Sequence, residues 1–205
     1  MKRTHRIAAL TVMLAFAGCA SGRDRAPATD WKVLASDDDR ERIRSWRSTW
    51  TAALKASRAA GNGARIDALG PLLQPDTSLG PPMPQPGDYS CTVYKLGATA
   101  MDMRDFSAEP PVTCRIAPRG ALLGIAKLDG AQRPSGWMYP DGPQRMIFLG
   151  SMRMADERRP LAYGGDPERN MAGILERVGK DRWRLALPRP RWEAMLTVVE
   201  IRPLD

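Results

Sequence analysis

The sequence predicts a mainly β domain of the α+β class, in which a helical segment precedes an antiparallel β-meander that forms a small barrel or a sandwich. Three observations support this prediction. Apolar residues recur at helical spacing from Ser36 to about residue 60, whereas short segments of alternating polarity follow Gly87. Residues 75–87, between the two patterns, are rich in proline and glycine, as is typical of a loop.

The first residues have the layout of an export signal. Lys2, Arg3 and Arg6 precede an apolar run over 7–16, and small residues come directly before Cys19. The ending Phe-Ala-Gly-Cys is similar to the lipobox of bacterial lipoproteins, in which the signal is cut before the cysteine and the cysteine is acylated, although Leu is usual where this chain has Phe. We therefore expect a lipid, such as palmitate, on Cys19.

Two other interpretations of this segment stay open, an ordinary signal peptide and an inner-membrane anchor. The apolar run is shorter than the roughly 20 residues that span a bilayer, which disfavours the anchor. Residues 1–18 are then the signal, 19–29 a flexible tether and 30–205 a single globular domain. Because Ala20 and Ser21 follow the cysteine, with no aspartate beside it, we expect a lipid-anchored, periplasm-facing protein of the cell envelope, at the outer membrane in preference to the inner one.

Residues 30–74 are expected to form a helical lead-in. Ser36 can cap a helix whose first turn, 37–39, is acidic and therefore favourable at a helix N-terminus. Glycines within 61–63 end this helix, and a second short helix is expected over 64–73. The apolar positions of the first helix are Ile43, Trp46, Trp50 and Leu54. Its two tryptophans could form a ligand platform, but an aromatic stripe at this spacing is more often part of a core.

Residues 88–205 are expected to form the antiparallel β part. Turn residues such as Asp129-Gly130 and Asp141-Gly142 separate about eight short segments of β character. The expected strands are 89–96, 112–116, 121–128, 136–139, 146–152, 171–178, 182–187 and 194–201. We expect the helical segment to cover an open face or edge of this barrel or sandwich.

Loss of the signal excludes several classes of function. The only histidine, His5, is removed with it, so Ser-His-Asp catalysis, Cys-His catalysis and His-ligated metal sites are unavailable. We expect no cofactor and no metal. Removal of three basic residues with the signal lowers the formal net charge from +8 to +5. The remaining arginines are scattered along the chain, so nucleic acid is not an expected partner.

Two cysteines, Cys91 and Cys114, remain beyond the lipidation site. Because exported proteins lie in an oxidising compartment, we expect these two to form a disulfide. Two buried free thiols are the alternative, and a metal site is a weaker one because companion ligands are missing.

Four parts of the chain resemble one bacterial family. They are Pro84-Gln85-Pro86-Gly87-Asp88-Tyr89-Ser90-Cys91 with Lys95-Leu96-Gly97, Gln132-Arg133-Pro134-Ser135-Gly136-Trp137-Met138-Tyr139-Pro140-Asp141 with Phe148-Leu149-Gly150, Tyr163-Gly164-Gly165-Asp166 with Ala172-Gly173-Ile174-Leu175-Glu176-Arg177, and Arg182-Trp183-Arg184-Leu185. They are similar to the uncharacterised family catalogued as DUF4893, over about Asp37 to Pro203. The resemblance implies a recurrent exported domain and assigns no activity.

The candidate ligand-binding residues are polar or aromatic side chains at expected loop mouths, where such folds place function: Arg133, Tyr139, Tyr163 and Asp166. Turn and packing roles are the alternative. Asp76, or Asp166 with Glu168, are candidate carboxylates for sugar hydrolysis, which depends on the distance between them. Exposed loop acids are the simpler interpretation, and no residue is assigned as catalytic.

These observations predict an envelope lipoprotein that binds something or supports the envelope without catalysis. Its expected partners are the membrane, through the lipid, and an envelope protein or a small ligand. Three alternatives stay open: a small-ligand-binding barrel, a protein like the lysozyme inhibitors, suggested by Tyr89-x-Cys91, and a carboxylate-dependent glycan hydrolase. The basic composition disfavours the inhibitor, because a strongly basic partner is better met by an acidic surface.

If Cys19 carries the membrane attachment, Cys19→Ser should release the protein from the membrane fraction into the soluble periplasm, because the acyl chains supply the binding energy. Fractionation of cells followed by immunoblotting measures the distribution. A variant that stays in the membrane fraction to the same extent as the unaltered protein would contradict lipidation at this residue.

Overall fold

The computed structural model describes residues 29–154, 157–159, 161–192 and 194–204, and Cys19 lies outside this part of the chain. The helices are α1 (Trp31–Leu34), α2 (Asp37–Arg44), α3 (Trp46–Ser57), the π-helical turn η1 (Arg58–Asn62), α4 (Gly63–Asp67) and the 3-10 helices η2 (Gly70–Leu73) and η3 (Pro167–Arg169). The strands are β1 (Gly87–Ala98), β2 (Phe106–Ala108), β3 (Val112–Arg119), β4 (Leu122–Lys127), β5 (Gln132–Pro140), β6 (Arg145–Met154), β7 (Asn170–Gly179), β8 (Arg182–Pro188) and β9 (Ala194–Pro203).

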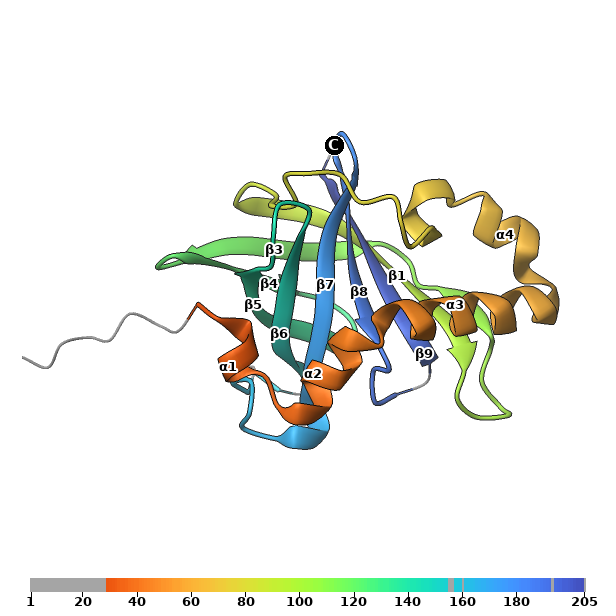
Figure 1. Ribbon diagram of the computed structural model, residues 1–205, viewed down its shortest axis with the longest axis horizontal. Coiled ribbons are helices and arrows are strands. Elements are labelled where there is room, and N and C mark those ends of the chain that lie inside the picture. Colours follow the sequence, from red (N-terminus) through yellow and green to blue (C-terminus); the bar gives the residue numbers. More distant parts are fainter. Residues whose placement is uncertain (1–28, 155–156, 160, 193, 205) are drawn as a thin grey trace, which may run out of the picture.

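The strands form a closed antiparallel barrel (Figure 1). Neighbours along the chain pair from β3 to β9, and the long strand β1 closes the barrel because it pairs with β3 on one side and with β9 on the other. The mainly β prediction is confirmed, and the structure is a barrel and not a sandwich. The eight predicted strands correspond to β1 and β3–β9. Strand β2, which pairs with the second half of β1, was not predicted.

Alternate residues of each strand point into the barrel, as the pleat requires. Tyr89, Cys91 and Val93, predicted to share one face of β1, all belong to this interior core. The predicted disulfide is confirmed: Cys91 on β1 bonds Cys114 on β3, with 5.8 Å between their Cα atoms. The bridge therefore links two adjacent barrel strands from the inside.

Side chains fill the barrel interior. Gly136 and Gly150 face each other across β5 and β6, and a Cβ atom at Gly136 would lie 2.4 Å from the Gly150 Cα. Because neither glycine has a side chain, the ring of Phe148 fits beside them inside the barrel. Methionines occupy much of the remaining space: Met138, Met146, Met152 and Met171. The cavity found within one end of the barrel measures ≈ 20 Å³, about enough for one water molecule.

A charged cluster lines that small cavity. Lys127 is only 4% exposed, and its ammonium donates to Glu109 Oε2 at 3.2 Å and to the Gln132 carbonyl at 3.0 Å. Lys95 also pairs with Glu109, at 3.2 Å. Burial would raise the pKa of Glu109, but the two ammonium groups together lower it below its ordinary value. Paired charges therefore lie beside apolar side chains such as Met152 and Trp192 at this end of the interior.

The helices cover the outside of β7, β8, β9 and β1, and do not cover an edge, since the barrel has closed (Figure 1). Trp50 is completely buried there, and its ring meets Trp46 edge to face at 6.0 Å between centroids. The single helix expected from Ser36 is wrong in one respect. It breaks at Ser45 (φ −90°, ψ 8°). The Glu41 carbonyl accepts there from both the Ser45 backbone N–H at 2.9 Å and the Ser45 hydroxyl at 2.8 Å, and such side-chain bonding to the preceding turn often bends a helix.

Arg184 holds the helical segment against the barrel. It lies on the outer face of β8 with no exposed surface, and its guanidinium pairs with Glu176 on β7 at 2.7 Å. The same guanidinium donates to four carbonyl groups of the turn that covers it, those of Pro71, Leu72, Gln74 and Pro75, at 2.6–3.1 Å. It also lies 4.6 Å from the ring centroid of Trp50. One side chain thus joins two strands, a turn and a helix.

Replacement of Arg184 by Met should lower the free energy of unfolding by about 3–5 kcal/mol, because it leaves the Glu176 carboxylate buried and unpaired. The double variant Arg184→Met/Glu176→Gln should recover part of this loss, since no buried charge remains. Denaturant titration measures the free energy.

The exposed ion pair of Arg115 and Asp88 provides the control, with 2.7 Å between Arg115 Nε and Asp88 Oδ1. Arg115→Met should cost less than about 1 kcal/mol, because solvent screens this pair. Equal losses for Arg115→Met and Arg184→Met would contradict the role given to Arg184.

Candidate functional site

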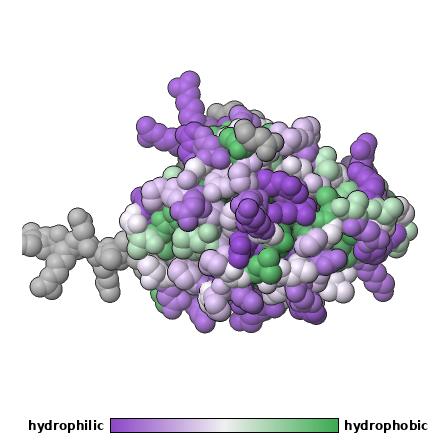
Figure 2. Space-filling model, turned by 90° about the horizontal axis from the view of Figure 1, so that it is seen from above, coloured by the Kyte–Doolittle hydropathy of each residue, from purple (hydrophilic) through white to green (hydrophobic). Residues whose placement is uncertain are grey.

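The large apolar side chains on the surface are dispersed. They include Val33, Leu79, Met83, Met101, Leu161 and Leu204. Figure 2 shows one face on which hydrophobic residues form small groups among hydrophilic ones. A binding surface on this domain is therefore better sought in a hollow than in a broad apolar patch.

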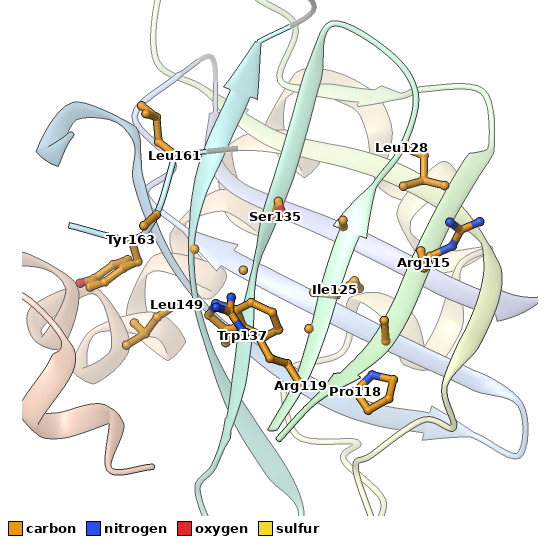
Figure 3. A pocket seen from close by; sticks show the side chains of 16 residues that line it. Arg115, Pro118, Arg119, Ile125, Leu128, Ser135, Trp137, Leu149, Leu161 and Tyr163 are labelled. Carbon is orange, nitrogen blue, oxygen red and sulfur yellow. The ribbon is translucent and has the colours of Figure 1, made fainter. Parts of the chain in front are cut away.

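An apolar hollow lies on the outer wall of the barrel, over β3, β4 and β5, and we call it the outer groove (Figure 3). Its volume is ≈ 340 Å³. Small residues form its floor: Ala117, Gly124, Ala126 and Ser135. Trp137 and Arg119 form one wall, while Leu161 and Tyr163, from the connection between β6 and β7, form another.

The floor follows from strand alternation. Ile116 and Ile125 point into the barrel core, so their neighbours Ala117, Gly124 and Ala126 point outward. A Cβ atom at Gly124 would lie 2.6 Å from the ring of Trp137, so this glycine lets the indole lie close over the floor. Small side chains on adjacent strands thus leave a depression that a large aromatic ring borders.

The charged residues that line the outer groove are both arginines. The Arg119 guanidinium stacks 4.8 Å from the Trp137 ring centroid, a cation-π contact, and makes no ion pair with a described residue. Arg115 is held by Asp88 through two hydrogen bonds of 2.7 and 2.9 Å. No carboxylate is among the lining residues. The groove thus combines an apolar floor with a positive rim.

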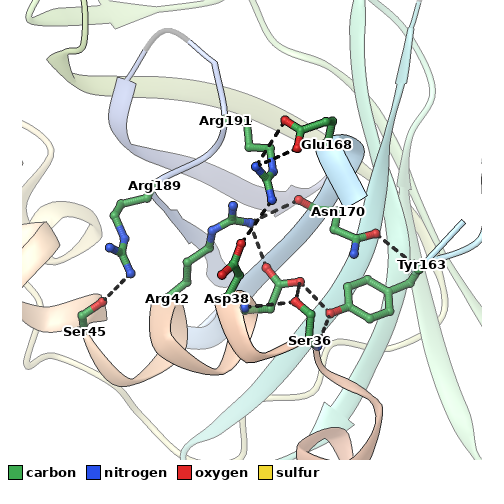
Figure 4. Close-up of polar contacts among 11 residues, drawn as sticks. Ser36, Asp38, Arg42, Ser45, Tyr163, Glu168, Asn170, Arg189 and Arg191 are labelled. Atoms are coloured by element: carbon green, nitrogen blue, oxygen red, sulfur yellow. Dashed lines mark hydrogen bonds and ion pairs between the residues drawn. The ribbon is translucent and has the colours of Figure 1, made fainter. Parts of the chain in front are cut away.

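Tyr163 connects the outer groove to helix α2 (Figure 4). Its ring lines the groove, while its hydroxyl donates to Asp39 Oδ2 at 2.6 Å and accepts from the backbone N–H of Ser36 at 2.9 Å. Asp39 is 1% exposed and also accepts from Arg42 at 2.8 Å. Desolvation, together with the hydrogen bond to Asp39, raises the pKa of Tyr163 to about 12. The groove wall is therefore fastened to the helical segment.

A second hollow of ≈ 490 Å³ is polar and lies between Trp46, residues 75–78 and the turn from β5 to β6. It contains three carboxylates, Asp76, Asp141 and Glu176, and each pairs with an arginine: Arg47, Arg145 and Arg184 respectively. The hydrogen bond from Arg47 lowers the pKa of Asp76. Asp76 is therefore held in its ionised form, and Asp141 and Glu176 are both occupied by ion pairs.

The structure separates the four predicted binding residues. Only Tyr163 lines the outer groove. Arg133 donates to the carbonyls of Met154 and Glu157, at 2.6 and 3.1 Å. Tyr139 is 7% exposed in the core beside α1, and Asp166 caps η3 through the Glu168 N–H at 3.0 Å. Arg133, Tyr139 and Asp166 have packing and capping roles in this arrangement.

The candidate carboxylates for hydrolysis are also paired. Asp76 lies in the polar hollow beside Arg47, and Glu168 is an exposed partner of Arg191 at 3.3 Å. Asp166 lies 3.4 Å from Arg169. In the described part of the chain, no three His, Cys, Asp or Glu side chains are grouped to hold a metal ion.

The sequence prediction missed Trp137, Arg119 and the small floor residues. Alternation along β4 and β5 does place Gly124, Ala126, Ser135 and Trp137 on one side of the sheet, and this was the available signal. It needs the register between strands before it describes a groove, because each position taken singly is an ordinary surface residue.

The domain of unknown function DUF4893 matches residues 31–201. No curated protein and no solved structure matches the chain. The helices of the described residues are all too short or too polar to cross a bilayer.

The four tyrosines should resist ionisation in the folded protein. Desolvation raises the pKa of Tyr89 and Tyr139, and the pKa values of Tyr94 and Tyr163 reach about 12. Since an unfolded tyrosine titrates near 10, this stabilisation is complete below pH 10 and is lost as the pH rises towards 12. We expect Tyr94 and Tyr163 to contribute little tyrosinate absorbance at pH 10.5 until the protein unfolds.

Tyr163→Phe should lower the free energy of unfolding at pH 8 by about 1–3 kcal/mol, because Asp39 loses a hydrogen bond. It should also weaken the fall of stability between pH 8 and 10.5. Tyr139→Phe is the control for the loss at pH 8, since burial alone raises the pKa of Tyr139 and this substitution takes no hydrogen bond from Asp39. Full tyrosinate absorbance at pH 10.5 in a protein with a native circular dichroism spectrum would contradict these assignments.

Proposed function

Since the chain belongs to the DUF4893 family, whose description assigns no activity, we propose its function from its own geometry. It is an envelope lipoprotein, anchored through Cys19 and facing the periplasm, whose domain is a binding module without catalysis. The outer groove is its binding face.

One observation carries the choice of face. Side chains of the described residues fill the barrel interior, where the cavity found measures ≈ 20 Å³, whereas the outer groove has a volume of ≈ 340 Å³. Ligand pockets usually measure about 300–1,000 Å³ and are mostly apolar, with a few polar groups. The groove fits this description, and the interior does not. This disfavours the alternative of a barrel that encloses its ligand.

The groove also lies close to the point where the tether joins the domain. Helix α1 begins at Trp31, directly after the tether, and the backbone of Ser36 is bonded to Tyr163 in the groove wall. An extended chain spans at most about 3.3–3.6 Å per residue, so a tether over 19–29 reaches roughly 40 Å at most. Anchoring through Cys19 therefore keeps this groove near a membrane surface.

Glycan hydrolysis is the second candidate, favoured by the polar hollow with Trp46 and three carboxylates. A glycosidase needs one carboxyl group that remains protonated near neutral pH to act as the general acid. Asp76 has a lowered pKa, and Asp141 and Glu176 are engaged by arginines. Turnover of peptidoglycan by the purified protein, abolished by Asp76→Asn, would favour the hydrolase over a binding module.

Carbene footprinting of the full-length protein tests the binding face. Trp137, Arg119 and Leu161 should be labelled less in intact envelopes than in purified protein, because a bound ligand excludes the reagent. Lys180 and Arg58, exposed residues away from the groove, provide the reference. Equal labelling of the groove residues in both preparations would contradict the groove as binding face.

A further inference from the structure

We propose that the outer groove binds a single-chain anionic amphiphile, a long-chain fatty acid, whose chain lies on the small-residue floor and whose carboxylate meets Arg119. This inference rests on the proposed function of the groove as the binding face, and it names the ligand class.

The floor fits an alkyl chain better than a peptide. Strands β4 and β5 are each paired on both sides, and β3 is paired with both β1 and β4 up to Ile116, so most backbone N–H and C=O groups of the floor are used within the barrel. A peptide that binds by strand addition needs a free sheet edge. An alkyl chain needs only apolar contact, which Ala117, Gly124 and Ala126 provide beneath Trp137 and Leu161. The volume of ≈ 340 Å³, near the lower end of ligand pockets, favours one chain over a two-chain lipid.

The rim selects the charge of the head group. Arg119 and Arg115 are the charged lining residues, with no carboxylate beside them in the lining, so a negative head group is complementary. Asp88 already occupies the guanidinium of Arg115. Arg119 is fixed by stacking on Trp137, and its guanidinium edge keeps hydrogen-bond donors for a partner. A guanidinium matches a carboxylate with two parallel hydrogen bonds.

The contribution of Arg119 is modest because its side chain is exposed. Exposed ion pairs are worth about 0.2–1 kcal/mol, which corresponds to a preference of up to about fivefold. Most of the affinity must therefore come from the alkyl chain in the groove, and the head group sets the preference among ligands with the same chain.

Photocrosslinking in isolated envelopes that contain the full-length protein tests this inference. Three probes share one alkyl chain with a diazirine at its centre: a palmitic acid, the corresponding alcohol and the corresponding lysophosphatidic acid. Mass spectrometry locates the crosslinked residues. We expect the acid to label the peptides of β4, β5 and residues 161–163, to be displaced by unlabelled palmitate, and to label more than the alcohol.

Three variants and one control are compared. Ala126→Trp fills the floor and should reduce labelling by about tenfold or more. Leu161→Asp, in an exposed loop where it does not disturb packing, places a negative charge in the wall and should reduce labelling by the acid more than by the alcohol. Arg119→Gln should reduce labelling by the acid about two- to fivefold and remove its preference over the alcohol. Lys180→Gln, with the same change of charge, should have no effect.

Groove labelling that survives both Ala126→Trp and Leu161→Asp would overturn the inference, as would equal labelling by acid and alcohol in the unaltered protein. Stronger labelling by the lysophosphatidic acid would overturn the choice of a carboxylate. If footprinting shows a protected groove but the acid does not label it, the proposed function stands and the fatty acid is wrong. If protection is also absent, both are wrong.

Discussion

The structure depends on one buried ion pair more than on any other contact. Arg184 and Glu176 lie on the outside of the barrel, where a cationic side chain with 0% exposure would be costly without its partner. Burial lowers the pKa of Arg184, and the carboxylate of Glu176 opposes this effect.

The remaining donors of the guanidinium are satisfied by carbonyl groups of residues 71–75, so this turn has a defined path over the barrel. Trp50 then packs on the guanidinium and donates to the carbonyl of Leu73 at 3.1 Å, which places α3. Helix, turn and barrel are therefore positioned by the same charged group.

Closure of the barrel explains why the interior and the exterior differ in use. The inward positions carry large side chains. Gly136 and Gly150, on β5 and β6, are the exceptions, because a Cβ atom at either position would overlap the ring of Phe148. The outward positions divide into two regions. Those under the helices are covered and, apart from the ion pair of Arg184 and Glu176, mostly apolar, whereas those on β3, β4 and β5 are small and remain open. A large exposed apolar surface lowers the solubility of a protein unless a ligand or partner covers it. The arginines at the rim add charge beside the groove, which favours solvation of this surface when no ligand covers it.

The sequence predicted the elements well because each follows from local patterning. Alternation and turn residues located eight strands, and the acidic first turn after Ser36 located the start of α2. Strand β2 was missed because three residues, Phe106–Ala108, are too few to show alternation, and they become a strand only by pairing with β1. At the break, the Ser45 hydroxyl donates to a carbonyl of the preceding turn, and helical periodicity does not reveal such a bond.

The candidate site was harder to predict for a related reason. Arg133 and Asp166 are polar residues near loops, but their partners are backbone groups that only the fold brings close.

The outer groove combines residues from three strands and one distant loop, so no continuous motif encodes it. Its wall is nevertheless coupled to the region of the chain that follows the tether, through Tyr163 and the buried Asp39 on α2. A hydroxyl that donates at 2.6 Å to a carboxylate engaged by Arg42 resists displacement, because each lost bond leaves a buried charge less satisfied. The direction of the groove relative to the start of the domain is thereby fixed. If the domain is anchored through Cys19, as we propose, this coupling also sets the orientation of the floor between Trp137 and Leu161 relative to the tether.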